Sequence, residues 1–120
     1  MFQMEQKKHV FDLEKRTLLF SKEMRDFCKL LPKSNANREY IPQLIRSSAS
    51  VGANYIEANE SLSKKDFVMR IKICRKEAKE TNYWLSLIEM EQENAQTQNE
   101  LQIECTELLK IFSAIILKSK

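Results

Sequence analysis

Residues 61–88 read SLSKKDFVMRIKICRKEAKETNYWLSLI, and this stretch decides the fold. Apolar or small side chains recur in it at alternating spacings of four and three, which places them on one face of a long helix and matches the seam of a helical bundle. Ser63 followed by Asp66 is a variant of the capping box, a hydroxyl at the N-cap with a carboxylate three residues on. We therefore predict a helix over residues 63–92 with an inner seam formed by Phe67, Ile71, Cys74, Ala78, Thr81, Leu85 and Ile88.

The same periodicity predicts a helix before this stretch and another after it. The first covers residues 10–31 and stops at Pro32, because the residue before a proline avoids helical geometry. The other covers residues 98–118, and Thr97 with Glu100 forms a capping box at its start. Their predicted seams are Val10, Leu13, Thr17, Phe20, Met24, Phe27 and Leu31 in the first, and Leu101, Cys105, Leu108, Phe112 and Ile115 in the other.

A further helix is predicted over residues 38–60, and Pro42 leaves two alternatives for its start. Either Pro42 occupies the first turn of a helix that begins near Ile41, or the helix begins at Asn37 and bends at the proline. The middle of this helix, SSASVGA, is nearly all small. We expect a neighbouring backbone to approach it closely, which explains the mid-helix Gly52. The predicted inner face is Ile41, Leu44, Ser48, Val51, Tyr55 and Ala58, with Ile45, Gly52 and Ile56 beside it.

The composition and the short links between the predicted helices indicate how the helices pack together. One glycine and two prolines in 120 residues leave little turn chemistry, and helix-forming residues are abundant. Links of a few residues force neighbouring helices to run antiparallel. We expect a single all-α domain over residues 1–120, an antiparallel up-down-up-down four-helix bundle with helices about 20° apart. No run approaches the roughly 20 apolar residues of a membrane span and no signal-peptide core is present, so we expect a cytoplasmic protein.

The sequence gives little support for catalysis. The only histidine, His9, is near the N-terminus and is interpreted as a surface residue. Carboxylates pair at helical spacing, Glu57 with Glu60 and Glu77 with Glu80, but a di-metal site in a bundle would need a histidine beside them. No glycine-rich phosphate loop or CxxC motif is present. We expect no catalytic residues, no metal and no cofactor.

The three cysteines are expected to be packing residues. Cys28, Cys74 and Cys105 are far apart, and each belongs to an apolar helical pattern. An odd number of cysteines without a secretion signal favours reduced thiols.

Charge is distributed unevenly although the net charge is only +3. Lys7 and Lys8 belong to a predicted basic end of the bundle, and Lys64 and Lys65 lie in the first turn of the helix over residues 63–92, where the helix dipole disfavours cations. Two interpretations stay open: a solvated face with Glu77 and Glu80 nearby as partners, or a stripe that binds phosphates. No aromatic residue lies between Lys72, Arg75, Lys76 and Lys79, which share one outer face, so base stacking on this face is not indicated. The candidate nucleic-acid-binding residues are Lys64, Lys65, Arg70, Lys72, Arg75, Lys76 and Lys79.

Three residues of the same helix lie off its inner seam and are apolar or aromatic, namely Tyr83, Trp84 and Leu87. A helix that is apolar on more than one face is normally buried on more than one face. A wide core within one chain would satisfy this pattern. We favour a contact between subunits, since aromatic residues are enriched at such interfaces.

Several segments together resemble a known family. They are RSSASVGAN at residues 46–54 with Glu57 and Ala58, SKKDF at 63–67, KEAKETNYWL at 76–85, and DLEKRT at 12–17 with Phe20. These segments are similar to the signature of the bacterial "four helix bundle protein" family, whose members include proteins encoded in intervening sequences of large-subunit ribosomal RNA genes. The similarity extends from about residue 10 to 88, and the last helix matches weakly.

The resemblance implies a left-handed antiparallel bundle that assembles into a homopentameric ring. It also implies kinship with the accessory variability determinant of diversity-generating retroelements, a basic pentamer that binds nucleic acid and a reverse transcriptase; the present chain is only mildly basic. Within this framework we hypothesise a structural polar pairing in which Arg46 and Asn54 meet Glu77 or Glu80, within one subunit or between subunits.

These observations lead to a functional hypothesis and two alternatives. We expect a non-enzymatic oligomeric bundle that binds RNA or another nucleic acid through the basic stripe. The first alternative is a scaffold that recruits protein partners without nucleic acid. A small-ligand or metal bundle enzyme ranks last, because ligating histidines are missing.

Overall fold

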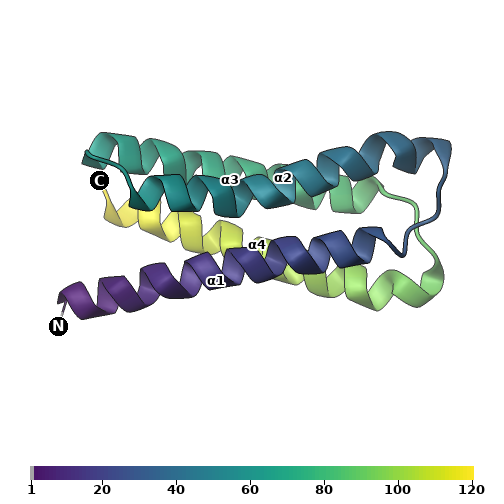
Figure 1. Cartoon of the computed structure of the whole chain (residues 1–120), viewed down its shortest axis with the longest axis horizontal. Coiled ribbons are helices and arrows are strands. Elements are labelled where there is room, and N and C mark those ends of the chain that lie inside the picture. Colours follow the sequence, from purple (N-terminus) through teal and green to yellow (C-terminus); the bar gives the residue numbers. More distant parts are fainter. Residues whose placement is uncertain (1) are drawn as a thin grey trace.

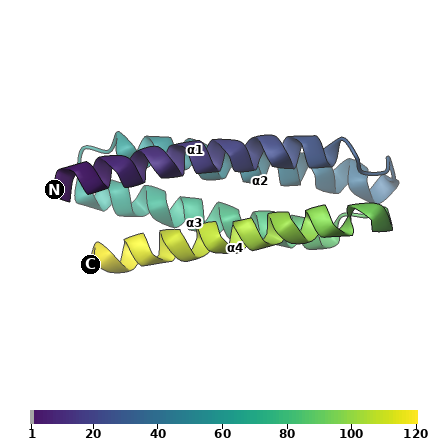
Figure 2. The same ribbon diagram turned by 90° about the horizontal axis from the view of Figure 1, so that it is seen from below.

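The computed structural model describes the backbone of residues 2–120 and the side chains of residues 13–120. Lys7, Lys8, His9 and Val10, singled out in the sequence, lie outside the described side chains. The four long helices are α1 (Phe2–Cys28), α2 (Asn35–Asn59), α3 (Lys64–Leu87) and α4 (Ala95–Lys118), and a short 3-10 helix, η1 (Gln92–Asn94), precedes α4. Successive long helices run in opposite directions along a rod of 48 × 23 × 19 Å (Figures 1 and 2). The prediction of an all-α antiparallel four-helix bundle is confirmed.

The core follows the seams read from the sequence. Large side chains of all four helices are completely enclosed, among them Phe20, Tyr55, Ile71 and Phe112. The cysteines are free and buried, as predicted. Two α2 residues expected beside the inner face are instead on the outside, since Ile45 is 41% and Ile56 51% exposed. Among the described seam residues, those fully or almost fully buried are Leu13, Thr17, Phe20, Met24, Phe27, Leu31, Leu44, Ser48, Val51, Tyr55, Ala58, Ile71, Cys74, Ala78, Thr81, Leu85, Ile88, Leu101, Cys105, Leu108 and Phe112.

Helix α2 begins three residues earlier than predicted. Ser34 is its N-cap, and the Ser34 hydroxyl accepts a hydrogen bond of 3.1 Å from the backbone N–H of Asn37. This bond satisfies one of the otherwise unpaired N–H groups of the first turn. Pro42 therefore lies inside the helix, at an exposed position. The first-turn alternative for Pro42 is wrong, because the cap at Ser34 starts the helix well before it.

Helices α3 and α4 also differ from their predicted limits. The backbone of Ile88 is extended, with φ −62° and ψ 148°, so α3 ends at Leu87 rather than near residue 92. Helix α4 starts at Ala95, directly after the 3-10 turn, and its N-cap Asn94 makes no side-chain cap bond. Thr97 is already inside α4, so the predicted Thr97–Glu100 capping box is wrong.

The side chain of Asn37 binds the backbone just after the end of α3. The side chain of Asn37 is completely buried and lies between the α1–α2 loop and the α3–α4 loop. Its Nδ2 donates to the carbonyl of Pro32 at 2.9 Å and to that of Glu89 at 2.8 Å, while its Oδ1 accepts from the backbone N–H of Glu89 at 2.9 Å. One amide side chain thus satisfies three backbone groups in the two loops.

The small-residue segment of α2 brings two helices close to it, as expected. Gly52 packs against Thr17 of α1. The Thr81 hydroxyl of α3 donates to the hydroxyl of Ser47 at 2.9 Å, and the Ser21 hydroxyl of α1 donates to the carbonyl of Ser48 at 3.2 Å. None of the described helices combines the length and apolar character that a bilayer span requires.

Candidate nucleic-acid interface

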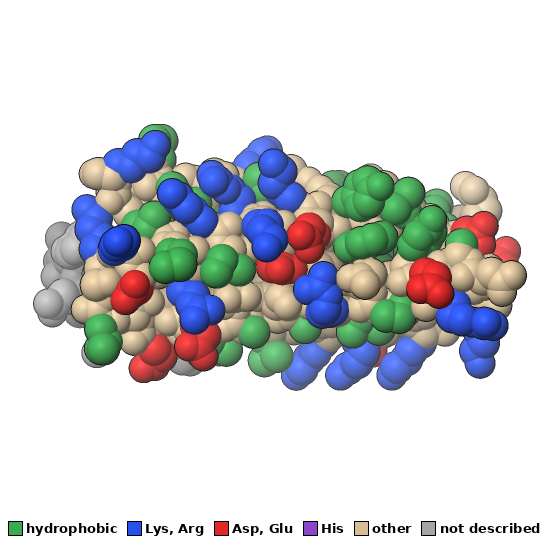
Figure 3. Space-filling view, turned by 90° about the horizontal axis from the view of Figure 1, so that it is seen from above, with side chains coloured by type: hydrophobic (Ala, Val, Ile, Leu, Met, Phe, Trp, Pro, Cys, Tyr) green, Lys and Arg blue, Asp and Glu red, His purple; other side chains and the backbone are tan. Residues whose placement is uncertain are grey.

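Helix α3 presents its basic residues on the outside of the bundle. Its start is fixed by Ser63, whose hydroxyl accepts from the backbone N–H of Asp66 at 3.1 Å, as the sequence indicated. Ala78, Leu85 and their neighbours along the seam occupy the inner face of α3. The candidate residues therefore lie on the remaining faces, and all of them are exposed except Arg75, which is half-buried. Figure 3 shows the face formed by α2 and α3, with Lys and Arg side chains gathered over its left half.

The two acidic residues in the middle of α3 lie beside Arg46 of α2. Arg46 of α2 places one guanidinium nitrogen 3.9 Å from Oε2 of Glu77 and another 3.6 Å from Oε2 of Glu80. The same guanidinium donates to the side-chain oxygen of Gln43 at 3.2 Å. Arg46 therefore meets both carboxylates within one chain, the arrangement that the polar-pair hypothesis describes.

Glu77 is the most constrained of these groups. The residue is 7% exposed, and its Oε2 accepts no hydrogen bond among the described residues. Burial raises the pKa of the Glu77 carboxyl and the nearby Glu80 raises it further, while Arg46 and Lys76 act in the opposite direction. A buried carboxylate is thus held beside an arginine that is itself half-exposed.

Asn54 has a different partner from the one hypothesised. Its Oδ1 accepts from a guanidinium nitrogen of Arg70 at 3.1 Å, and its Nδ2 donates to the carbonyl of Ser50 at 2.9 Å. The expected pairing of Asn54 with Glu77 or Glu80 is therefore not formed within one chain. It fails because residue 54 lies two turns beyond Arg46 along α2, opposite the earlier part of the antiparallel α3. Arg70, one of the candidate phosphate contacts, is already held by α2.

The other six cations of the stripe are not neutralised within the described part of the chain. Among side chains from residue 13 onward, none of the six forms an ion pair with a carboxylate. Ion pairs of basic residues elsewhere do form, such as the bidentate contact of Arg16 on α1 with Glu104 on α4, both bonds being 2.7 Å. The six residues are Lys64, Lys65, Lys72, Arg75, Lys76 and Lys79.

The three apolar residues proposed as a subunit contact do not share one environment. Tyr83 is 60% exposed, Leu87 is half-buried, and Trp84 is half-buried and packs against the core. The ring of Trp84 lies 5.9 Å from that of Tyr40 on α2 and 5.4 Å from that of Tyr83. Figure 3 shows a hydrophobic cluster toward the right of the same face that carries the cations. Sequence periodicity missed Tyr40, because its contact with Trp84 is made between helices.

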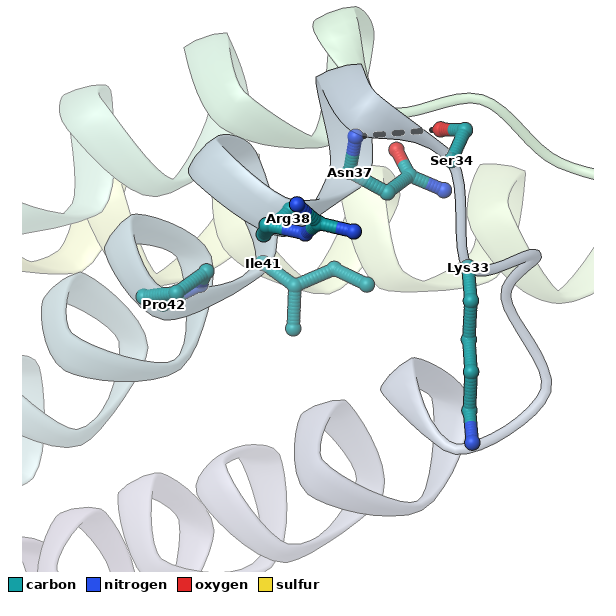
Figure 4. A pocket seen from close by; sticks show the side chains of 6 residues that line it. All are labelled: Lys33, Ser34, Asn37, Arg38, Ile41 and Pro42. Atoms are coloured by element: carbon teal, nitrogen blue, oxygen red, sulfur yellow. Dashed lines mark hydrogen bonds between the residues drawn. The ribbon is translucent and has the colours of Figure 1, made fainter.

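One open hollow lies at the opposite end of α2 from the stripe. It is formed by the α1–α2 loop and the first two turns of α2, with Ile41 and Pro42 beside the basic side chains of Lys33 and Arg38 (Figure 4). The polar group lining it most deeply, Asn37, uses its side chain for the loop contacts described above. The amide of Asn37 is therefore committed to the loops and not to the hollow.

The remaining reactive groups are shielded. Burial raises the pKa of Cys28 to about 11 and the pKa values of Cys74 and Cys105 to about 12. The Cys105 thiol also donates to the carbonyl of Ala78 at 3.0 Å. Among the side chains of residues 13–120, no three His, Cys, Asp or Glu residues converge as metal ligands would.

Comparison with known proteins places the chain in a family. The family model described as 23S rRNA-intervening sequence protein matches residues 11–114. The chain belongs to this family. The comparison with curated protein sequences gave no significant match.

A solved structure has a similar fold. The chain is similar to a crystal structure of a protein with unknown function from the S23 ribosomal protein family of Bacteroides thetaiotaomicron. The two share 29% sequence identity, the match covers 87% of this chain and 97% of the other, and the TM-score is 0.73. The likeness therefore extends over most of this chain.

Proposed function

We propose that this protein is a non-enzymatic bundle that binds RNA or another polynucleotide through the basic face of α3. The observation that carries the proposal is the set of six cations on α3 without a carboxylate partner among the described side chains. Unpaired surface cations arranged along a rod attract a phosphate backbone and release its counterions, without reading base sequence. The family's association with intervening sequences of 23S rRNA makes RNA the first polynucleotide to test.

The placement of the acidic residues supports the same function. Glu77 and Glu80 could have neutralised the stripe, which was the alternative interpretation of the sequence. Instead they approach Arg46 on the α2 side of the helix. Among the described side chains, Lys72, Lys76 and Lys79 form no ion pair with either carboxylate, although Lys76 still contributes to the electrostatic environment of Glu77.

The test is a titration of structured RNA at several salt concentrations. We expect binding at low salt and a linear fall of log K with log salt concentration. A variant with Gln at Lys72, Lys76 and Lys79 should bind much more weakly, and its salt slope should be smaller by about 2 to 3, since each phosphate contact accounts for roughly 0.7 to 0.9.

A matched control removes the same charge elsewhere. Exchanging Lys22, Lys33 and Lys118 for Gln also changes the net charge by three, but these exposed residues are on α1, the α1–α2 loop and α4. If both triple variants bind RNA equally well, or if the unmodified protein does not bind at low salt, the proposal is wrong.

A second candidate function is protein–protein contact, including assembly of several copies of this chain. Large apolar side chains on α1 and α4 are more than half exposed, among them Leu18 and Leu19 at 55% and 56% and Ile103 at 56%. Exposed apolar surface of this kind is a feature of interaction sites. Exchanging Leu19 and Ile103 for Ser should lower the mass measured by light scattering, whereas the same exchange at Leu62, fully exposed in the α2–α3 loop, should not.

A further inference from the structure

Tyr83 continues the line of cations along the outer face of α3. Lys72, Lys76, Lys79 and Tyr83 follow one another at spacings of four, three and four residues, which keeps them on one side of a helix. All four are exposed. The sequence showed no aromatic residue between the cations, and the structure agrees; the aromatic side chain stands at the end of the line instead.

The ring of Tyr83 packs against the ring of Trp84. Its centroid lies 5.4 Å from that of Trp84 with the planes at 69°, an edge-to-face contact. Trp84 in turn packs against the core and against Tyr40, and its Nε1 is buried. Tyr83 is therefore an aromatic side chain that is 60% exposed, packs against a half-buried tryptophan, and lies one helical turn from Lys79.

We propose that Tyr83 is a stacking platform for an unpaired base of a single-stranded polynucleotide whose phosphates run along Lys72, Lys76 and Lys79. This inference rests on the proposed function and specifies its ligand. Base stacking on an aromatic ring is available only to a base that is not enclosed in a duplex, whereas phosphate contacts are available to either form. The combination of cations and an exposed ring thus favours a single strand over a duplex.

The dimensions give the site a size. From Lys72 to Tyr83 the helix advances eleven residues, about 16 Å at a rise of roughly 1.5 Å per residue. A stacked strand advances about 3.4 Å per nucleotide, so the line spans about five nucleotides. Each copy of the chain should therefore bind a short segment of the polynucleotide strand, and the stacked base should lie at the Tyr83 end of that segment.

The experiment compares three ligands of equal length with the full-length protein: oligoadenylate, an abasic strand with the same phosphates, and a duplex. We expect the unmodified protein to bind oligoadenylate best. Tyr83→Ala should weaken oligoadenylate binding roughly 10-fold and leave the abasic strand and the salt slope unchanged. Tyr83→Phe keeps the ring and should bind like the unmodified protein, while circular dichroism checks that both variants fold.

The outcomes separate this inference from the function on which it rests. If Tyr83→Ala and the unmodified protein bind oligoadenylate equally tightly, and no more tightly than the abasic strand, the stacking site is refuted. Phosphate binding then remains supported. A preference for the duplex has the same consequence. If Tyr83→Ala lowers the mass measured by light scattering, Tyr83 is a contact between copies and the inference is overturned. If none of the three ligands binds at low salt, the proposed function itself fails.

Discussion

Gly52 of α2 lies so close to Thr17 of α1 that a Cβ added at Gly52 would stand 3.0 Å from Thr17 Oγ1 and 3.2 Å from Thr17 Cβ. Thr17 cannot easily move away, because its hydroxyl donates to the carbonyl of Leu13 at 2.8 Å in the turn before it. The closest approach of these two helices therefore depends on a residue without a side chain, and the small-residue segment of α2 has a packing role.

The first prediction concerns this contact. Gly52→Ala should lower the free energy of unfolding by about 1 to 3 kcal/mol through overpacking, although alanine favours a helix over glycine by about 1 kcal/mol. Urea denaturation followed by circular dichroism measures the change. As a control, Ala49→Gly at an exposed position of α2 measures the difference in helix propensity between alanine and glycine without a packing contribution. A stabilised Gly52→Ala protein would contradict the close approach.

The second prediction concerns Asn37. Asn37→Ala removes three hydrogen bonds to backbone groups of the two loops, and a hydrogen bond of this kind contributes about 0.5 to 1.5 kcal/mol. We expect a loss of at least about 2 kcal/mol in the free energy of unfolding, measured in urea. Asn35→Ala, in the same turn but exposed, should change it by less than about 0.5 kcal/mol. Equal effects of the two exchanges would show that the bridge between the loops is unimportant.

The third prediction concerns pH and the pair of Arg46 with Glu77. Because the pKa of Glu77 is raised in the folded protein, the native state keeps this proton to higher pH than the unfolded chain does. The contribution of Glu77 to stability therefore falls as pH rises above the ordinary carboxyl pKa of 4.5, through the interval up to its raised native value. Arg46→Met removes the opposing charge, so it should cost about 1 kcal/mol at pH 7 and less at pH 4.

The control for this experiment is the exchange Glu77→Gln. In protein that already carries Glu77→Gln, the loss of stability caused by Arg46→Met should increase less between pH 4 and pH 7. The reason is that Glu80 is then the remaining carboxylate beside Arg46. An effect of Arg46→Met that is the same at both pH values and in both backgrounds would refute the electrostatic coupling.

The fourth prediction concerns the thiols. Cys28, Cys74 and Cys105 are buried, and their raised pKa values keep them protonated at neutral pH. Iodoacetamide at pH 8 should modify none of them in the native protein and all three in urea, as measured by intact mass. Modification of one thiol in the native state, at a rate independent of added urea, would show that its helix opens locally.

Periodicity alone was sufficient for the bundle. The three-four spacing of apolar residues and the scarcity of glycine and proline leave a chain of this length one way to bury its seams. Helix ends were less predictable: the sequence contains a plausible cap at Thr97, but the 3-10 turn and the contact of Asn37 with Glu89 settle where the chain turns. The contact of Asn37 with Glu89 joins residues 52 positions apart, and no local pattern encodes it.

The same division holds for the candidate site. The sequence by itself determined which helix carries the cations, because the seam of α3 fixes which residues face outward. The pairing of Arg46 with Glu77 and Glu80 could be hypothesised from the sequence, but only the tertiary structure decided that both carboxylates meet Arg46 within one chain and that Asn54 holds Arg70. The physical reason is that a helix specifies its own faces through backbone geometry, whereas pairing depends on the side chains that a neighbouring helix brings within a few ångströms.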